Sequence, residues 1–471
     1  MNKKLLTLKY VLFDLLAAAI SWGLFYSYRK IYVEHFPIEK IHLGNDDTFF
    51  LGLSIIPFFW LALYYFTGEY RNLLRKSRLQ ELASTFKLVL VGSVILFFIL
   101  ILDDYISSYK NYYSSFFTLF SLQFVFTYIP RLTITSSTIR KMRRGEFSFN
   151  TLIIGAREKA VGLIKEMSNK PKSSGNKFIG FVPLEPQEQY PLEEYLPKLG
   201  DSLEDINTIV KEYKVDEVII SLDYQEKNKL EKVISRLELL HTRTLMQPDL
   251  YDILTGYVQT TSLYSIPLLE VTHELMPPWQ ENVKRFLDVV FSIIAITILI
   301  PLYVGISIAI KANSKGPVFY SHTRIGRFGK PFTIYKFRSM VVDAEKNGPQ
   351  LSNHTDNRIT SVGRFLRKTR LDEIPQFYNV ILGNMSLVGP RPERQFFIDQ
   401  IVERAPHYYH LLRVRPGITS LGQVKYGYAE NVDQMIERLR YDIIYIENMS
   451  LYVDFKIMIY TIKTIFEASG K

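Results

Sequence analysis

The sequence contains no cysteine among its 471 residues, which excludes disulfide bonds, a thiolate nucleophile and a cysteine-ligated zinc site. Its eight histidines show no HExxH or comparable ligand spacing. The glycine-rich GxGxxG signature is also incomplete: after a predicted strand at residues 151–155, Arg157 stands where a second glycine would let the backbone approach a pyrophosphate. Dinucleotide binding by this segment is therefore a weak hypothesis. We favour a structural or regulatory role for this segment, and a plain α/β spacer agrees with the pattern at least as well.

Long apolar runs, by contrast, are plentiful. Four occur early in the chain, at residues 10–28, 49–66, 88–102 and 116–129, and the last two need flanking residues to span a bilayer. Lysine and arginine precede the first run, separate the second from the third and follow the fourth, whereas the other two loops are mixed or acidic. By the positive-inside rule we expect four transmembrane helices with both ends in the cytoplasm. A cleaved signal peptide is the alternative for the first run, but three more runs follow it.

A fifth apolar run begins after Lys284 and Arg285, is broken by Pro301 and ends before two further lysines. Cations at both ends argue that both ends stay on the cytoplasmic face. Asp288 would be costly in hydrocarbon unless it lies at the interface or pairs with Lys284 or Arg285. We therefore predict a shallow re-entrant hairpin over residues 284–311. An ordinary transmembrane helix with a proline kink is the alternative.

Between these apolar regions the pattern changes to short β-rich segments that alternate with amphipathic ones. Residues 151–155 and 217–221 are typical of buried parallel strands, and residues 202–212 and 226–240 are typical of helices. We expect a small Rossmann-like α/β domain here.

The last third of the chain carries the densest set of polar motifs. Basic and apolar residues alternate over residues 335–340, which predicts a strand with Lys336 and Arg338 on one face and Phe337 toward the core. Two cations on one face make a site for a diphosphate. The same pattern is also typical of a solvated edge strand.

A second basic motif leads into two adjacent carboxylates, Asp372 and Glu373. If this segment is helical, Arg364, Lys368 and Asp372 share one face at spacings of four residues, with Arg367 beside them. Cations would thus converge on a carboxylate. The alternative is a capping box, in which Asp372 only helps to cap the helix that follows.

The carboxylate pair itself suggests phosphoryl chemistry. Pro375 places the pair at a kink or a helix start, where unpaired backbone groups can face a ligand. Two neighbouring ionised carboxylates repel each other unless a cation or proton intervenes. Asp372 and Glu373 are therefore candidates for sharing Mg²⁺, brought with substrate phosphates, or for dividing the roles of nucleophile and metal ligand.

A third motif holds Arg391 between Pro390 and Pro392. The prolines restrict the local backbone, so the guanidinium is preorganised to bind a phosphate. Taken alone the motif could be only a rigid turn, but its spacing from the Asp372–Glu373 pair favours phosphate binding. The formal net charge of +10 could in principle suit nucleic acid. Because the cations cluster beside apolar segments and in the last third, anionic lipid headgroups and phosphorylated substrates are simpler partners, and we expect no nucleic acid.

Together and in this order, the motifs resemble those of the bacterial polyprenyl-phosphate hexose-1-phosphate transferases, membrane enzymes that begin assembly of O-antigen, capsule or exopolysaccharide. The resemblance is dense over residues 284–471. It rests on Lys284-Arg285 with Asp288, on the hairpin with Pro301, and on residues 336–340, 358–360, 371–376, 389–392 and 415–419. A four-helix unit followed by a Rossmann-like domain also looks like the large members of this family.

The resemblance implies that Asp372 attacks the β-phosphate of a UDP-sugar, releases UMP and holds the sugar phosphate until a polyprenyl phosphate takes it. It implies that Glu373 binds Mg²⁺ together with Asp372. The candidate substrate-binding residues are Lys336, Arg338, Arg364, Arg367, Pro390, Arg391 and Pro392. Residues 420–426 and Ile300 depart from the family pattern, so sugar and nucleobase contacts near the former stay open.

The resemblance also implies the organisation of the chain. We expect four transmembrane helices in residues 1–148, a Rossmann-like domain in 149–250, a linker in 251–283, the re-entrant hairpin in 284–311, and an α+β catalytic domain in 312–471 that ends in interfacial helices. The expected location is the bacterial inner membrane, with the catalytic domain facing the cytoplasm. Expected partners are a UDP-sugar, polyprenyl phosphate and inner-membrane lipids, with a homodimer as the candidate assembly.

Two other functions remain open from the residues. A glycosyltransferase that moves only the sugar and releases UDP would use a similar acidic site. A non-catalytic membrane scaffold that senses nucleotide sugars would agree with the degenerate turn at Arg157.

Overall fold

The chain divides into two compact units in a computed structural model. The structure describes residues 3–37, 46–101, 109–168, 175–186, 188–223, 226, 229–238, 240, 242–248, 268–271, 275–342, 344, 356–427 and 429–466. One unit comprises residues 1–148 with 171–175, and the other comprises residues 149–170 with 176–471. Most of the predicted linker, residues 251–267 and 272–274, lies outside the described residues, as does the end of the third predicted apolar run.

The first unit is helical. Its four long helices are α1 (Lys3–Tyr28), α2 (Asp47–Phe66), α3 (Arg78–Leu96) and α4 (Tyr109–Arg143). Helices α1, α2 and α4 each contain one predicted apolar run, and the third run begins in α3 and continues into the π-helical turn Phe97–Ile101. Helices α3 and α4 begin well before their runs, which supplies the length that the runs alone lacked. Helix α1 packs against α2 and α4, and the buried rings of Trp22 and Trp60 lie in their shared core.

A buried ion pair joins the first and last of these helices. The Arg131 guanidinium donates from Nε and Nη2 to the two oxygens of Asp14, at 2.8 and 2.7 Å. The same guanidinium lies over the Tyr64 ring, 4.2 Å from its centroid. Both charged side chains are almost fully buried, so each depends on the other for compensation.

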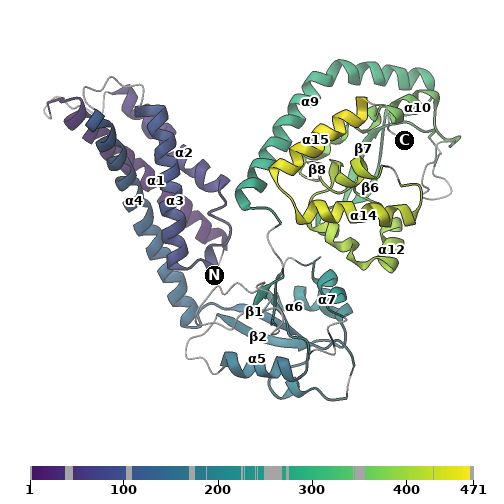
Figure 1. The fold of residues 1–471 in the computed structure, drawn as a ribbon, viewed down its shortest axis with the longest axis horizontal. Coiled ribbons are helices and arrows are strands. Elements are labelled where there is room, and N and C mark those ends of the chain that lie inside the picture. The colour runs from purple at the N-terminus through teal and green to yellow at the C-terminus, as the bar shows by residue number, and fades with distance from the viewer. Residues whose placement is uncertain are drawn as a thin grey trace. The chain divides into compact units, whose positions relative to one another are not determined.

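The second unit begins with a five-stranded sheet in the order β2-β1-β3-β4-β5. Strands β1 (Phe149–Ile154), β2 (Asn176–Val182), β3 (Glu217–Ile220) and β4 (Arg243–Met246) are parallel, and β5 (Leu269–Glu270) is antiparallel. Alternate residues of β1 and β3 face opposite sides, with α5 (Glu158–Ser168) on one side and α6 (Ile206–Glu212) and α7 (Leu230–Leu237) on the other (Figure 1). The sheet is Rossmann-like, as the alternating pattern predicts. Because β5 belongs to it, the domain extends into the predicted linker.

The C-terminal part of this unit is an α+β domain with two small sheets. Strands β6 (Phe319–Ile325) and β7 (Pro331–Phe337) form an antiparallel hairpin, and β8 (Ser386–Val388) pairs in parallel with β9 (Gly417–Thr419). The remaining helices are α10 (Ser361–Lys368), α11 (Gln376–Ile381), α12 (Gln395–Arg404), α13 (Leu421–Lys425), α14 (Val432–Glu447) and α15 (Leu451–Phe466). Buried residues of α12, α14 and α15 form the main core with Val388 of β8.

Helix α9 (Pro278–Asn313) contains the fifth apolar run and is continuous across Pro301. Figure 1 shows that this helix changes direction part-way along. Its first half contacts β8 and α11 through Lys284 and Arg285, and Ile306 and Ile310 of its second half pack with Leu366 of α10. Both halves thus pack on the same domain. By length and composition, α9 is one of five described helices that could cross a membrane.

Of the two alternatives for Asp288, pairing with Lys284 or Arg285 does not occur in the structure. The Asp288 carboxylate accepts a hydrogen bond from Ser386 Oγ at 2.7 Å and one from the backbone N–H of Leu387 at 3.3 Å, rather than an ion pair from Lys284 or Arg285. Lys284 binds the Asp454 carboxylate of α15 instead, at 2.7 Å. Asp288 is tolerated in an apolar helix because it is buried against the backbone of β8.

Candidate active site

Strand β7 brings Lys336 to the carboxylate pair. The Lys336 ammonium donates to Glu373 Oε1 at 2.7 Å and lies 4.0 Å from Asp372 Oδ2. Its side chain is only 15% exposed, so the alternative of a solvated edge strand does not apply to this residue. A side chain 36 residues upstream in the sequence thus compensates the carboxylates from another element.

The local backbone differs from the predicted helix. Helix α10 ends at Lys368, Arg370 adopts a left-handed conformation with φ of 55°, and residues 371–373 form a 3₁₀ turn. Arg364 and Asp372 therefore do not share a helix face, and Arg364 is exposed on α10. The predicted convergence of Arg364 and Lys368 on Asp372 is wrong because the left-handed residue breaks the helical register.

The capping-box alternative is also wrong. The Thr369 hydroxyl donates backward to the carbonyl oxygens of Phe365 and Leu366, and α11 begins at Gln376, preceded by Pro375, without a side-chain cap. Asp372 is thus not used to cap a helix. Its carboxylate accepts no hydrogen bond from the part of the chain that the structure describes, although the side chain is buried.

The two carboxylates differ in their electrostatics. Burial raises the pKa of Asp372 to about 6, and Lys336 offsets this only in part. Burial alone would also raise the pKa of Glu373, but Lys336 and Arg391 outweigh it and hold that pKa well below its usual range. Glu373 is therefore the charge-compensated anion of the pair, and Asp372 is the less stabilised and more basic one.

Arg391 reaches the same carboxylate from the loop after β8. Its Nη2 donates to Glu373 Oε1 at 3.2 Å, so one oxygen receives both cations. Arg324 also fixes this loop, because it donates to the carbonyl oxygen of Pro392 and to Glu393, each at 2.8 Å. Buried Glu393 also binds Arg438 of α14 at 2.6 Å. The flanking prolines are thus supplemented by a buried ion network.

Two glycines let the loop lie directly against β9. A Cβ on Gly389 would lie 2.4 Å from the carbonyl oxygen of Arg415, and one on Gly417 would lie 2.1 Å from the Gly389 nitrogen. The motifs around residues 389–392 and 415–419, far apart in sequence, are therefore paired in space. This pairing fixes where Arg391 emerges.

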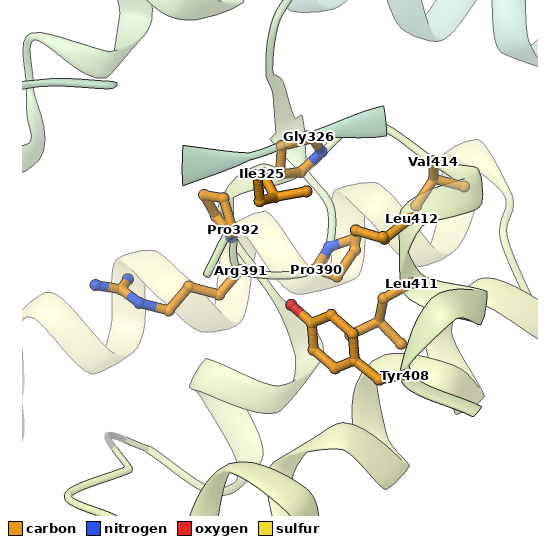
Figure 2. A pocket seen from close by; sticks show the side chains of 10 residues that line it. Ile325, Gly326, Pro390, Arg391, Pro392, Tyr408, Leu411, Leu412 and Val414 are labelled. Atoms are coloured by element: carbon orange, nitrogen blue, oxygen red, sulfur yellow. The ribbon is translucent and has the colours of Figure 1, made fainter. Parts of the chain in front are cut away.

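A small pocket lies on the other side of this loop. It is lined by Pro390, Pro392 and Ile325 and by residues of the 3₁₀ segment Pro406–Arg413 such as Tyr408 and Leu412. Figure 2 shows the Arg391 guanidinium pointing away from this pocket. The pocket is therefore backing for the loop and is separate from the carboxylate pair.

Two other predicted substrate-binding residues have different positions. Arg338 follows the end of β7, is buried, and donates to the carbonyl oxygens of Ser314 and Lys315 at the end of α9, at 2.8 and 3.2 Å. The prediction that Arg338 shares the substrate face with Lys336 is wrong, because the strand pattern ends at Phe337. Arg367 donates from Nε to Ser339 Oγ at 2.9 Å and lowers the pKa of Asp372.

Two cations at the start of α9 bind backbone carbonyl groups near the site. Lys284 donates to the carbonyl oxygen of Val388 at 3.0 Å, and Arg285 donates to those of Val380 and Ile381 at the end of α11. Both predicted hairpin cations thus bind backbone carbonyl groups that lie, in the sequence, between the carboxylate pair and Arg391. Asp454, Glu393 and Arg324 were not predicted from the sequence, because the ion pairs they form join distant parts of the chain.

The carboxylate pair suits Mg²⁺ in one respect. Mg²⁺ is commonly held by one or two carboxylates together with substrate phosphates. Asp372 has no hydrogen-bonding partner in the described part of the chain, and the Lys336 and Arg391 contacts of Glu373 both fall on Oε1. The described residues contain no cluster of three acidic or histidine side chains, so substrate would have to supply further ligands.

Two family models match separate parts of the chain. Residues 279–468 match the family model of the bacterial sugar transferases, and residues 66–248 match a model described as a CoA-binding domain. The first match covers α9 and the whole carboxylate site. The second covers α3, α4 and strands β1 to β4 of the Rossmann-like sheet.

Three curated relatives show how far the similarity extends. The chain is 39% identical over 241 residues, 51% of its length, to the UDP-N-acetylgalactosamine-undecaprenyl-phosphate N-acetylgalactosaminephosphotransferase of Aeromonas hydrophila, and spans 56% of that protein. It is 40% identical over 186 residues to a UDP-glucose:undecaprenyl-phosphate glucose-1-phosphate transferase of Caulobacter vibrioides, which is 39% of this chain and 69% of that protein. It is 27% identical to the undecaprenyl-phosphate galactose phosphotransferase of Salmonella typhimurium, in an alignment 491 positions long that covers 99% of this chain and 97% of that protein.

Proposed function

The chain belongs to the bacterial sugar transferase family, and from this premise we propose that it transfers a sugar-1-phosphate from a UDP-sugar to undecaprenyl phosphate and releases UMP. The relatives are named for this class of transfer, with N-acetylgalactosamine, glucose or galactose as the sugar. The observation that carries the proposal is the asymmetry of the carboxylate pair. Glu373 is bound by two cations, while the buried Asp372 beside it accepts no hydrogen bond from the described residues.

In the first half of the reaction, an Asp372 oxygen attacks the β-phosphorus of the donor. The bond between that phosphorus and the oxygen bridging to the α-phosphorus breaks, and UMP leaves with the bridging oxygen. The product is an aspartyl phosphosugar, which divides one difficult transfer into two steps. Burial favours attack because a desolvated carboxylate with a raised pKa is a stronger nucleophile.

In the second half, a phosphate oxygen of the lipid attacks the same phosphorus. The bond to the Asp372 oxygen breaks, which regenerates the carboxylate and yields a lipid diphosphate sugar. Lys336, Arg367 and Arg391 would neutralise charge on the phosphates in both halves, with Pro390 and Pro392 bracing the loop. Mg²⁺ bound by Asp372 and Glu373 with the diphosphate would add charge neutralisation.

The membrane arrangement follows from the same premise. A lipid phosphate and a soluble nucleotide must meet at one surface, so we propose that α9 is a re-entrant hairpin in the inner membrane and that the catalytic domain faces the cytoplasm. Support comes from the bend in α9 and from the packing of both its halves on one domain (Figure 1). We propose that α1 to α4 are transmembrane helices, and that the transfer initiates a surface polysaccharide.

The decisive experiment uses the full chain in nanodiscs with undecaprenyl phosphate and a panel of UDP-sugars. Release of UMP and a lipid diphosphate sugar is the expected result. Release of UDP would instead identify a glycosyltransferase that moves only the sugar, and no turnover with any donor would favour a sensor. A donor labelled in the sugar should also leave label on the wild-type protein, which peptide mapping would assign to residue 372.

A further inference from the structure

His322 of β6 lies on the same face of the β6–β7 pair as Lys336. In the β6–β7 ladder, Tyr320 lies opposite Lys336, and His322 lies opposite Ile334. Directly opposed residues of an antiparallel pair project from the same face, and every second residue of a strand shares it. His322 and Tyr320 therefore lie on the face from which Lys336 reaches Glu373. The rings of these two β6 residues are 5.2 Å apart between centroids.

The tautomer of His322 is fixed by its neighbour. Arg324 Nε lies 2.7 Å from His322 Nε2. Since a guanidinium only donates, Nε2 must accept, and the neutral ring carries its proton on Nδ1. Burial and the nearby cations Arg324 and Arg394 keep the pKa of His322 far below its usual value, so the ring stays neutral.

The Nδ1–H group is a buried hydrogen-bond donor with no acceptor among the described residues. Among the described residues, Nδ1 has no hydrogen-bond partner although it is shielded from solvent. A buried donor without an acceptor is destabilising, and such groups in native proteins often serve a ligand. The missing partner must therefore be an acceptor.

The positive charges around His322 favour an anionic group as the acceptor for Nδ1–H. The positive charges of Lys336 and Arg391, which belong to the candidate active site, also lower the pKa of the His322 ring, as do those of Arg324 and Arg394. Arg324, which binds His322, also donates to the carbonyl oxygen of Pro392 in the loop that carries Arg391. A neutral donor among several cations suits a phosphate oxygen, which accepts hydrogen bonds and offsets the positive charge.

We propose that His322 is a phosphate-binding residue, whose Nδ1–H donates a hydrogen bond to a non-bridging phosphate oxygen of a substrate held by Lys336 and Arg391. The inference rests on the proposed function for the identity of that substrate. The phosphate belongs either to the UMP portion of the donor or to the polyprenyl acceptor. In neither case does His322 transfer a proton.

The test compares three variants of the full chain in nanodiscs. His322→Phe keeps a ring beside Tyr320 and removes the donor. His322→Gln offers an amide oxygen to Arg324 and an N–H to the ligand. Thr323→Val changes an exposed residue on the opposite face of β6 and is the matched control. The dissociation constants of UMP and uridine, the KM of undecaprenyl phosphate and the thermal unfolding of each variant are measured.

If the phosphate belongs to the UDP-sugar, we expect His322→Phe to raise the dissociation constant of UMP about 10–100-fold and to leave that of uridine unchanged, as for the loss of a hydrogen bond to a charged group. For an acceptor-side contact the same loss appears in the KM of the lipid phosphate. His322→Gln should restore most of either loss, and Thr323→Val should match wild type.

Unchanged phosphate affinities in His322→Phe, or equal losses for UMP and uridine, would overturn the assignment. A lower unfolding temperature in His322→Phe with unchanged affinities would overturn it as well, because it would make His322 only a packing residue. A wild-type protein that binds UMP through His322 yet never releases UMP from any donor would refute the proposed function and leave the His322 assignment standing.

Discussion

The Lys336 ammonium is 2.7 Å from the Glu373 carboxylate but 4.0 Å from that of the adjacent Asp372. This difference separates two side chains that the sequence presents as equivalent. Lys336 and Arg391 lower the pKa of Glu373, whereas burial raises that of Asp372. The geometry therefore favours Asp372 as the nucleophile and Glu373 as the residue that organises the cations.

The first prediction concerns Asp372→Asn. We expect this isosteric change to abolish both the lipid-linked product and the labelled protein adduct, because an amide cannot form an acyl phosphate. The folded protein should be at least as stable as wild type at pH 7, since it no longer holds a poorly solvated anion. Product analysis and thermal unfolding check the two parts. Turnover near the wild-type rate would remove Asp372 from the mechanism.

The matched change Glu373→Gln should behave differently. It leaves Lys336 and Arg391 without their shared carboxylate, and loss of one partner of a buried ion pair costs about 3–5 kcal/mol. Glu373→Gln should therefore lower the free energy of unfolding, whereas Asp372→Asn should not. Denaturant titrations of both variants under the same conditions make the comparison.

The second prediction concerns pH. Because the pKa of Asp372 is raised from 3.8 to about 6, the nucleophile becomes protonated as the pH falls through 6. The rate of UMP release should be level above this pH and fall about tenfold for each further pH unit below it. A pH profile of kcat/KM for the UDP-sugar is the measurement. A rate unchanged down to pH 5 would show that Asp372 is ionised there.

The same shift has an opposite effect on stability. A carboxyl group whose pKa is higher in the folded state binds its proton more tightly there, so its contribution is fully present below about pH 4 and is lost as the pH rises to about 6. Wild type should therefore lose stability relative to Asp372→Asn over this window. The difference between their unfolding free energies at pH 4 and pH 7 measures it.

How much the sequence could predict depended on the distance between partners. The apolar runs, the parallel strands and the carboxylate motif follow from local pattern, and helices or strands lie at each of these places. Arg364 and Arg338 were misplaced because one left-handed residue, Arg370, and the end of one strand changed the register. The Lys284–Asp454 and Asp288–Ser386 contacts join residues 170 and 98 positions apart, which no local periodicity encodes.

The third prediction separates the two cations of the β7 motif. Lys336→Met should reduce UMP release by at least about 100-fold, because its contacts are with the reactive pair. It should also lower the unfolding temperature, since buried Glu373 then keeps only one of its two cations. Arg338→Met should cost about 2–4 kcal/mol of unfolding free energy, since its guanidinium satisfies the end of α9. Kinetics and unfolding of both variants give the answer. Equal catalytic losses at equal stability would contradict the positions of the two side chains.

The last prediction concerns the topology of α9, and the absence of cysteine makes it direct. Single cysteines at Trp279→Cys and Ala312→Cys would lie near the two ends of α9, where both native residues are exposed. A re-entrant hairpin requires both ends to react with a membrane-impermeant maleimide from the cytoplasmic side, in inside-out vesicles, and neither to react in intact spheroplasts. A straight spanning helix would expose Ala312→Cys on the opposite side from Trp279→Cys. That result would move one half of α9 away from the domain on which both halves pack, so it would contradict the contacts of Asp288 with β8 and of Arg338 with Ser314.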